Sequence, residues 1–293
     1  MKYAISHETT YSYSSSVHQS YHLLHLMPAK VPSQRILQHR LTISPAPNAR
    51  QDRVDFFGNP ITLLSLAQEH NALVVLAESE IEVVHYFQGD LAASLDWQLI
   101  ASGAALAGRE DAKDVWQFSA SSRHGPRIQE IGAYAASSFP PGRPVLQGCD
   151  DLMRRIFDDF TFDPSSTDVS TPVEHVFSER RGVCQDFAHL MISGLRSLGL
   201  PARYVSGYIL THPPEGQPKL QGADASHAWV SVWSPDFGWV DFDPTNNVIP
   251  RGEHVTFAYG RDYDDISPIS GVLLGGGGHD VEVAVDVLLT DAV

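Results

Sequence analysis

Short runs of alternating apolar and polar residues fill the first third of the chain. They cover residues 3–13, 35–44, 59–66 and 72–84, are rich in Val, Ile and Thr, and are separated by turn residues. Successive side chains of a strand point to opposite faces, so this alternation predicts half-buried strands, and turn signals at this spacing favour antiparallel pairing. We therefore expect an antiparallel β-domain over residues 1–90.

The apolar spacing becomes helical in the second half of the chain and then returns to strands. Residues 128–139 and 149–160 carry apolar side chains at the helical period. Strand patterns follow at residues 203–210, 227–234, 238–244 and 281–287. Helices followed by strands are typical of an α+β domain with an antiparallel sheet, which we expect over residues 127–293. Residues 91–126 have no clear period and are interpreted as a connecting region with a helix or two.

Composition and charge exclude several classes of protein. Apolar residues make up 43% and charged residues 19%, as in a folded chain. Asp and Glu number 35 against 20 Lys and Arg, so the net charge of −15 argues against a nucleic-acid partner. No leader-like apolar segment and no run of the ~18 apolar residues that a membrane span needs is present, so we expect no membrane partner and a cytoplasmic location. The sequence does not indicate the oligomeric state.

The two cysteines, Cys149 and Cys184, cannot form a disulfide framework, and each is expected to be a free thiol. Cys184 stands at the start of a predicted helix that ends before Gly199 and Pro201. The apolar residues that share one face of that helix with Cys184 are Phe187, Ala188, Met191, Leu195 and Leu198. The N-terminus of a helix stabilises a thiolate, although a lone cysteine on an apolar face is more often structural.

A predicted hairpin supplies a base for this thiol. The strands at 227–234 and 238–244 flank a turn near Pro235, which places His227 and Asp243 opposite one another on one face, roughly 5 Å apart at Cβ. A slip of one residue would move Asp243 to the other face. An imidazole between a thiol and a carboxylate is the arrangement of an activated nucleophile, whereas each residue alone is more often a strand-end histidine or a turn carboxylate.

Several stretches carry a family resemblance. GVCQDFAHLMISGLRSLGLPARYVSGY, SHAWVSVW and GWVDFDPTNN resemble the transglutaminase-like superfamily, and HETTYSYSSSV, FGNP and YGRDYDDISPISGV resemble its bacterial members with an N-terminal β-domain. The resemblance implies a papain-like fold in which the cysteine helix packs on an antiparallel sheet. It also implies that Cys184 is the nucleophile, His227 the base and Asp243, rather than Asp241, the orienting carboxylate.

The expected reaction is attack of the Cys184 thiolate on an amide or ester carbonyl of a peptide or protein, with release of the acyl group to water or to an amine. We expect a cysteine peptidase or amidase that needs no cofactor; the alternatives are a transglutaminase and a non-catalytic transglutaminase-like binding module. The Cys184 N–H and one further donor would meet the oxyanion. Tyr204 or Tyr208 is the candidate donor, although both also fit as sheet-core aromatics. Trp229 joins them as a candidate substrate contact.

The histidine and acidic clusters of the sequence do not favour a metal site. His18, His22 and His25 have the i, i+4, i+7 spacing of a zinc face on a helix, but they lie within the predicted β-domain, where a strand would separate His22 from His25. No CxxC or HExxH motif is present. The acidic residues of GRDYDDIS are interpreted as a solvated turn or as part of the rim of the family's active site. We therefore expect no bound metal.

Overall fold

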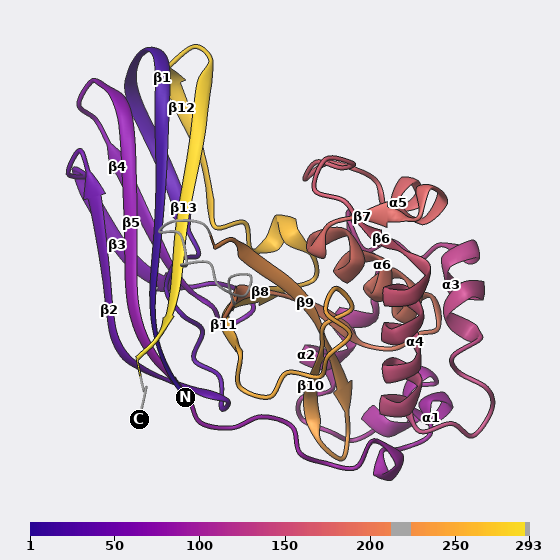
Figure 1. Ribbon diagram of the computed structural model, residues 1–293. Coiled ribbons are helices and arrows are strands. Elements are labelled where there is room, and N and C mark those ends of the chain that lie inside the picture. The colour runs from indigo at the N-terminus through magenta and orange to yellow at the C-terminus, as the bar shows by residue number, and fades with distance from the viewer. Residues whose placement is uncertain (212–223, 291–293) are drawn as a thin grey trace, which may run out of the picture.

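The computed structural model describes residues 1–211 and 224–290 and contains two large sheets with helices packed on the second (Figure 1). The first sheet is antiparallel, with the order β2-β5-β1-β4-β3 and with β12 and β13 also paired to β1. Its strands are β1 (Lys2–Leu24), β2 (Gln34–Ser44), β3 (Ala49–Val54), β4 (Pro60–Leu66), β5 (His70–Val83), β12 (Ile269–Gly275) and β13 (His279–Leu289). The predicted N-terminal β-structure is therefore present, with β1 longer than expected and β3 not anticipated.

Strand β1 is the centre of this sheet. Its first half pairs with β5 and β13, and its second half pairs with β4 and β12. Figure 1 shows β1 turning over between the two halves. One apolar cluster combines buried side chains of three strands, among them Leu24 of β1, Leu64 of β4, and Leu73 and Val75 of β5. The sheet therefore folds over on itself and encloses its own core, as in a β-sandwich.

The last two strands lie in a different sheet from the one that the sequence predicted. Residues 269–289 were assigned to the domain over 127–293, but Ile269 pairs with Leu24 and Leu289 pairs with Tyr3, so β12 and β13 join the N-terminal sheet. Alternation of apolar residues predicts a strand but does not say which edge the strand joins. The first sheet is thus built from both ends of the chain.

The second sheet is antiparallel, with the order β10-β9-β8-β11. Its strands are β8 (Ala202–Ile209), β9 (Ser226–Ser234), β10 (Gly238–Phe242) and β11 (His254–Gly260). The longer helices are α3 (Gln129–Ala136), α4 (Val145–Asp159), α5 (Val173–Glu179) and α6 (Cys184–Ser197). The connecting region contributes α1 (Trp97–Ala101), α2 (Ala112–Trp116) and the 3-10 turns η1 (Leu91–Ala93), η2 (Ala104–Leu106) and η3 (Gln117–Ser119); β6 (Thr161–Phe162), β7 (Arg181–Gly182) and η4 (Tyr263–Asp265) complete the order. The predicted α+β class is confirmed.

Helix α6 is the central helix of this part of the molecule. Phe187 and Met191 of α6 share one apolar cluster with Val230 and Val232 of β9, so the cysteine helix packs on the sheet as the resemblance implied. A second cluster joins the two sheets and includes Tyr208 of β8 and residues of β1, β5, β11 and β13. Within residues 1–211 and 224–290, no helix is long and apolar enough to cross a bilayer. The location in the cell stays a prediction.

Candidate active site

Cys184 is the first residue of α6, and local contacts fix this start. Asp186 is buried, and its Oδ2 accepts hydrogen bonds from the Val183 N–H at 2.8 Å and from the Thr167 hydroxyl at 2.6 Å. A Cβ on Gly182 would lie 2.8 Å from the Asp186 side chain, so this approach requires glycine. The helix ends as predicted, since Gly199 has a φ of +84°. The partly buried Cys184 thiol therefore lies at the N-terminal end of a well-capped helix.

The hairpin that carries the base differs from the prediction in its register. Ser234 pairs with Gly238 and Trp233 with Trp239, so the turn is centred on Asp236 rather than on Pro235. The left-handed residue that closes a three-residue turn is Gly238, with a φ of +71°, and its position sets the register. The predicted direct opposition of His227 and Asp243 is therefore wrong. The shift is by an even number of residues, so the two side chains still share a face.

His227 and Asp243 are in contact. The His227 Nε2 lies 2.7 Å from the Asp243 Oδ2, and the Asp243 side chain is fully buried just beyond the end of β10. The other carboxylate oxygen accepts the backbone N–H groups of Thr245 and Asn246 at 3.0 and 3.2 Å. The Asn246 amide also donates to Oδ2 at 2.7 Å. The turn after β10 thus fixes both oxygens of the carboxylate.

A second histidine, which the sequence analysis did not predict as part of the site, contacts the same oxygen. The His254 Nε2, from the start of β11, lies 2.9 Å from the Asp243 Oδ2. Its ring is edge-on to Trp229, with centroids 5.0 Å apart. Strand β11 pairs with β8 and not with β10, so the approach of His254 to Asp243 depends on the order of the sheet. Local sequence shows only a histidine at the start of a strand.

The charges of this group follow from its hydrogen bonds. Burial alone would lower the pKa of His227, but hydrogen bonds with Asp243 and with Cys184 outweigh burial and raise it to about 10. Burial likewise disfavours the Asp243 carboxylate, yet the bonds from His227 and His254 lower the pKa of Asp243 well below its usual range. At neutral pH the pair is therefore an imidazolium and a carboxylate. Because Nε2 faces Asp243, Nδ1 is the nitrogen that remains for the Cys184 thiol.

The three predicted substrate contacts lie in different surroundings. Trp229 is fully buried, and its ring stacks with the His227 ring at a centroid distance of 6.1 Å. Tyr204 is buried against His189 of α6, and its pKa lies well above 10 because of burial and then of the nearby Cys184. The Tyr208 hydroxyl instead bonds to the Nδ1 of His7 in β1. Tyr204 therefore lies near the thiol, whereas Tyr208 belongs to the contact between the sheets.

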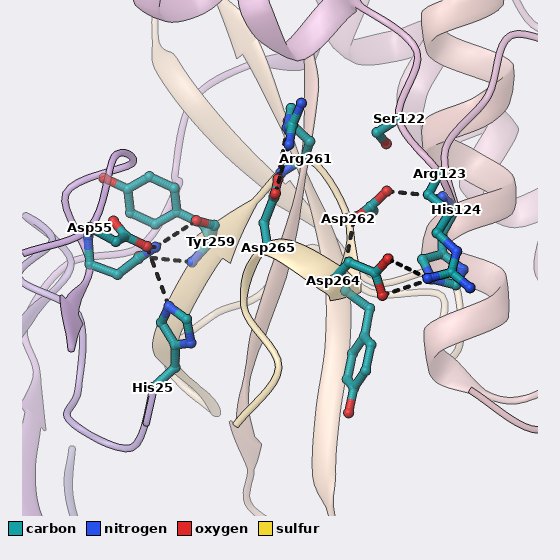
Figure 2. A network of polar contacts seen from close by, with 12 residues as sticks. His25, Asp55, Ser122, Arg123, His124, Tyr259, Arg261, Asp262, Asp264 and Asp265 are labelled. Atoms are coloured by element: carbon teal, nitrogen blue, oxygen red, sulfur yellow. Dashed lines mark hydrogen bonds and ion pairs between the residues drawn. The ribbon is translucent and has the colours of Figure 1, made fainter. Parts of the chain in front are cut away.

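The acidic segment after β11 is not simply a solvated turn. Asp262 is 2% exposed, and its Oδ2 accepts the backbone N–H of His124 at 2.9 Å. Asp264 lies 3.1 Å from the His124 Nε2, as Figure 2 shows. The Tyr263 N–H donates to the Nε2 of His189, which lies on α6. The segment is thus bonded to the helix that carries Cys184.

The residues considered for metal binding form no common site. His18 contacts Glu69 at 2.7 Å, and the Nδ1 of His25 contacts the Ser267 carbonyl at 3.0 Å. Ligand atoms of His227, Asp243 and His254 do lie within 4.8 Å of one another. Both Nε2 atoms, however, point at one carboxylate oxygen at hydrogen-bond distance, whereas zinc takes His and carboxylate ligands around itself at ~2.0–2.2 Å. We interpret this group as a hydrogen-bonded cluster.

Comparisons with known proteins agree with this architecture. Residues 3–82 match the family model described as the bacterial transglutaminase-like N-terminal region, and residues 135–244 match that of the transglutaminase-like superfamily. The uncharacterized protein Rv2569c of Mycobacterium tuberculosis is 37% identical over 299 residues, covering 98% of this chain and 92% of that protein. A protein-glutamine gamma-glutamyltransferase of Pseudomonas aeruginosa is 37% identical over 93 residues, which cover 31% of this chain and 14% of that enzyme.

Among solved structures, a candidate cysteine protease from Cytophaga hutchinsonii has the same fold. Its TM-score is 0.79 at 22% sequence identity, and the alignment covers 100% of this chain and 91% of that chain. The fold and both family matches agree with the residues quoted from the sequence. The chain belongs to the transglutaminase-like superfamily.

Proposed function

We propose that this protein is a cysteine-dependent acyl-transfer enzyme that hydrolyses amide bonds, as a peptidase or amidase. The observation that carries the proposal is the position of His227, which contacts the buried Asp243 carboxylate at 2.7 Å. His227 also lies near enough to the Cys184 thiol for that thiol to raise the pKa of the imidazole. The imidazolium stabilises a thiolate, and the carboxylate fixes the orientation of the ring. A non-catalytic binding module would have no need of this arrangement.

The mechanism follows from these groups. The Cys184 thiolate attacks the amide carbonyl carbon and forms a tetrahedral oxyanion. The His227 Nδ1–H then protonates the amide nitrogen and the C–N bond breaks. The amine leaves, and the acyl group remains on Cys184 as a thioester. Neutral His227 next takes a proton from water, whose oxygen attacks the thioester. The C–S bond breaks, the carboxylic acid leaves, and the thiolate–imidazolium pair forms again.

Two donors are proposed for the oxyanion. The first is the Cys184 backbone N–H, which lies in the first turn of α6 and has no acceptor within the helix. The second is the Tyr204 hydroxyl, because Tyr204 stacks on His189 of α6, the helix that carries Cys184, and burial raises the pKa of Tyr204 and keeps its hydroxyl protonated. A Tyr204→Phe variant should lose kcat with little change in the reaction of Cys184 with a small alkylating agent.

The substrate class is a peptide or protein amide. Transfer of the acyl group to an amine, rather than to water, is the second candidate reaction. It is favoured by the similarity of 93 residues of the chain to a protein-glutamine gamma-glutamyltransferase. The two reactions share the thioester and differ only in the nucleophile that resolves it.

The first experiment measures iodoacetamide labelling at pH 6 by mass spectrometry. We expect preferential alkylation of Cys184 and its loss in His227→Ala. Equal labelling of Cys149 and Cys184 would contradict an activated thiolate. Cys149 is an internal control for unfolding, because this second free thiol is fully buried.

The second experiment separates hydrolysis from transfer. Benzyloxycarbonyl-Gln-Gly serves as the acyl donor, with and without hydroxylamine. Hydrolysis releases ammonia and the γ-carboxylic acid, whereas transfer yields the γ-hydroxamate only when hydroxylamine is present. Hydroxamate in excess of the acid would show that transfer to an amine, rather than hydrolysis, is the main reaction. The control is Cys184→Ala, which should form neither product.

A further inference from the structure

Residues 260–268, which connect β11 to β12, are bonded to the cysteine-bearing part of the molecule along one side. The Tyr263 N–H donates to His189 at 3.3 Å, and Asp262 accepts the N–H of His124 at 2.9 Å. The Tyr263 ring lies 6.5 Å from the ring of Tyr204 between centroids. The segment therefore lies beside Tyr204 and beside α6, the helix that carries Cys184.

The other side of this segment is bonded to the N-terminal sheet. The buried Asn59 pairs with the backbone of Tyr259, the residue directly before the segment. The Asn59 amide donates to the Tyr259 carbonyl at 2.8 Å, and the Tyr259 N–H donates to the Asn59 Oδ1 at 3.0 Å. This pair of bonds imitates the pairing of two strands, and it fixes the point from which the segment leaves β11.

A second attachment holds the far end of the segment. The Nδ1 of His25 lies 3.0 Å from the Ser267 carbonyl, and the His25 N–H donates to the Pro268 carbonyl at 2.9 Å. Asp55 joins the two attachments, because its Oδ2 accepts the Asn59 amide at 2.7 Å and lies 3.4 Å from the His25 Nε2 (Figure 2). We call Asp55, Asn59 and His25 the clamp.

The FGNP motif of the sequence builds the turn that presents the clamp. The Asp55 Oδ1 accepts the N–H groups of Phe57 and Asn59, each at 2.8 Å. Gly58 has a φ of +94°, which favours glycine. Phe57 also packs on Phe118 of the connecting region at a centroid distance of 5.8 Å. Through Phe57 the turn thus also contacts the second part of the molecule.

We propose that the N-terminal β-domain holds residues 260–268 in place beside Cys184 through the clamp, and that Asn59 and His25 are positioning residues for the acyl substrate. The segment is fixed at both ends by the first sheet and presents its middle to α6. Loss of one attachment would release that end while the three residues Cys184, His227 and Asp243 keep their contacts. The kinetic part of this inference rests on the proposed function, and the structural part does not.

The test compares Asn59→Ala with wild type by amide hydrogen exchange. We expect exchange at the Tyr263 and Asp264 amides to rise at least tenfold in the variant, with no change at Val230 in the middle of the second sheet. The control is Asn48→Ala, which removes a bond to the Ala67 N–H within the first sheet and should leave the segment unchanged. An unchanged segment in folded Asn59→Ala, or equal acceleration at Val230, would overturn the proposal.

A second pair of variants covers the case in which Asn59→Ala does not fold. His25→Asn keeps a donor at the position of Nδ1 and should retain the bond to Ser267, whereas His25→Ala loses it. We expect faster exchange of the segment in His25→Ala and protection restored in His25→Asn. Equal exchange in the two variants would overturn the role of His25.

Kinetics add a result that a merely structural role would not give. In the clamp variants the KM for benzyloxycarbonyl-Gln-Gly should rise about fivefold, with kcat and the alkylation rate of Cys184 within about twofold of wild type. A fall in kcat with unchanged KM would argue against positioning of the substrate. If wild type does not turn over the probe, the proposed function fails, while the exchange experiment still decides the clamp.

Discussion

The two cysteines of this chain show how surroundings decide the chemistry of a thiol. Cys149 lies inside α4, is fully buried in the apolar cluster, and has its pKa raised by burial and by Asp150. Cys184 lies at the first position of α6, is partly exposed, and is near enough to His227 to raise the pKa of that imidazole. Both thiols lie on helices. Position at the helix end and a charged partner therefore distinguish the proposed nucleophile from the structural thiol.

The largest effect is expected from removal of His227, which should make the reactivity of Cys184 most like that of an ordinary thiol. At pH 6 a thiol with the ordinary pKa of ~8.5 is about 0.3% thiolate, so His227→Ala should slow alkylation of Cys184 by about 100- to 300-fold. In wild type the imidazolium persists from pH 6 to 8.5, because the pKa of His227 is about 10, so we expect the rate to depend on pH less steeply than in the variant. In the variant the rate should rise roughly 100-fold over the same range.

The measurement is the alkylation rate followed by mass spectrometry of the Cys184 peptide. Labelling of Cys149 in the same samples reports unfolding and should stay absent in both proteins. A variant that reacts at the wild-type rate at pH 6 would show that the helix end alone activates Cys184.

The carboxylate should have the next largest effect. In Asp243→Ala, His227 loses the carboxylate that orients its ring. An opposite charge at contact distance shifts a pKa by about 1 to 3, so from a pKa of about 10 the imidazole should still be charged at pH 6. The alkylation rate should therefore fall by less than in His227→Ala, roughly tenfold, because the ring is no longer fixed toward the thiol. Asp241→Asn is the matched control, because Asp241 lies two residues earlier in β10, opposite Ser231. If Asp241→Asn has the larger effect, the assignment of the orienting carboxylate is wrong.

What the sequence could predict is what local rules encode. The start and end of α6 follow from Gly199 and the apolar spacing, and the shared face of His227 and Asp243 survived a register error because the error was even. Arg196 was not anticipated. It is fully buried on α6 and donates to five acceptors, which belong to Phe118, Ser122, Gly125, Ala202 and Arg261.

The missed residues share a physical cause. Arg196 bonds to Phe118 and Arg261, which are 78 and 65 residues away, and Asn59 bonds to Tyr259 across 200 residues. His254 is only 11 residues from Asp243, but the two lie at strands on opposite edges of the second sheet. Strands β12 and β13 likewise find their partner in β1 at the opposite end of the chain. No local period or turn signal encodes these pairings, so only a tertiary structure could place them.

His254 should have a smaller effect than Asp243, because Asp243 keeps the bonds from Asn246 and from the turn when His254 is lost. We expect His254→Ala to slow alkylation of Cys184 by about threefold to tenfold, which is the range of one ordinary hydrogen bond. His254 lines a cavity of about 630 Å³ between the two parts of the molecule. Added imidazole should therefore restore the rate in His254→Ala, and not in Asp243→Ala. Failure of imidazole to restore the rate would indicate a packing role.

The smallest effect on the reactivity of Cys184 is expected from substitution of Cys149. Cys149→Ala removes one buried sulfur, so the free energy of unfolding should fall by about 1 to 2 kcal/mol, measured by chemical denaturation. Cys149→Ser should cost more, because a buried hydroxyl without a partner is unfavourable. The alkylation rate of Cys184 should stay within twofold of wild type in both variants. A larger change would mean that packing around α4 also sets the geometry of the thiol on α6, and that the two cysteines are coupled through the apolar cluster they share.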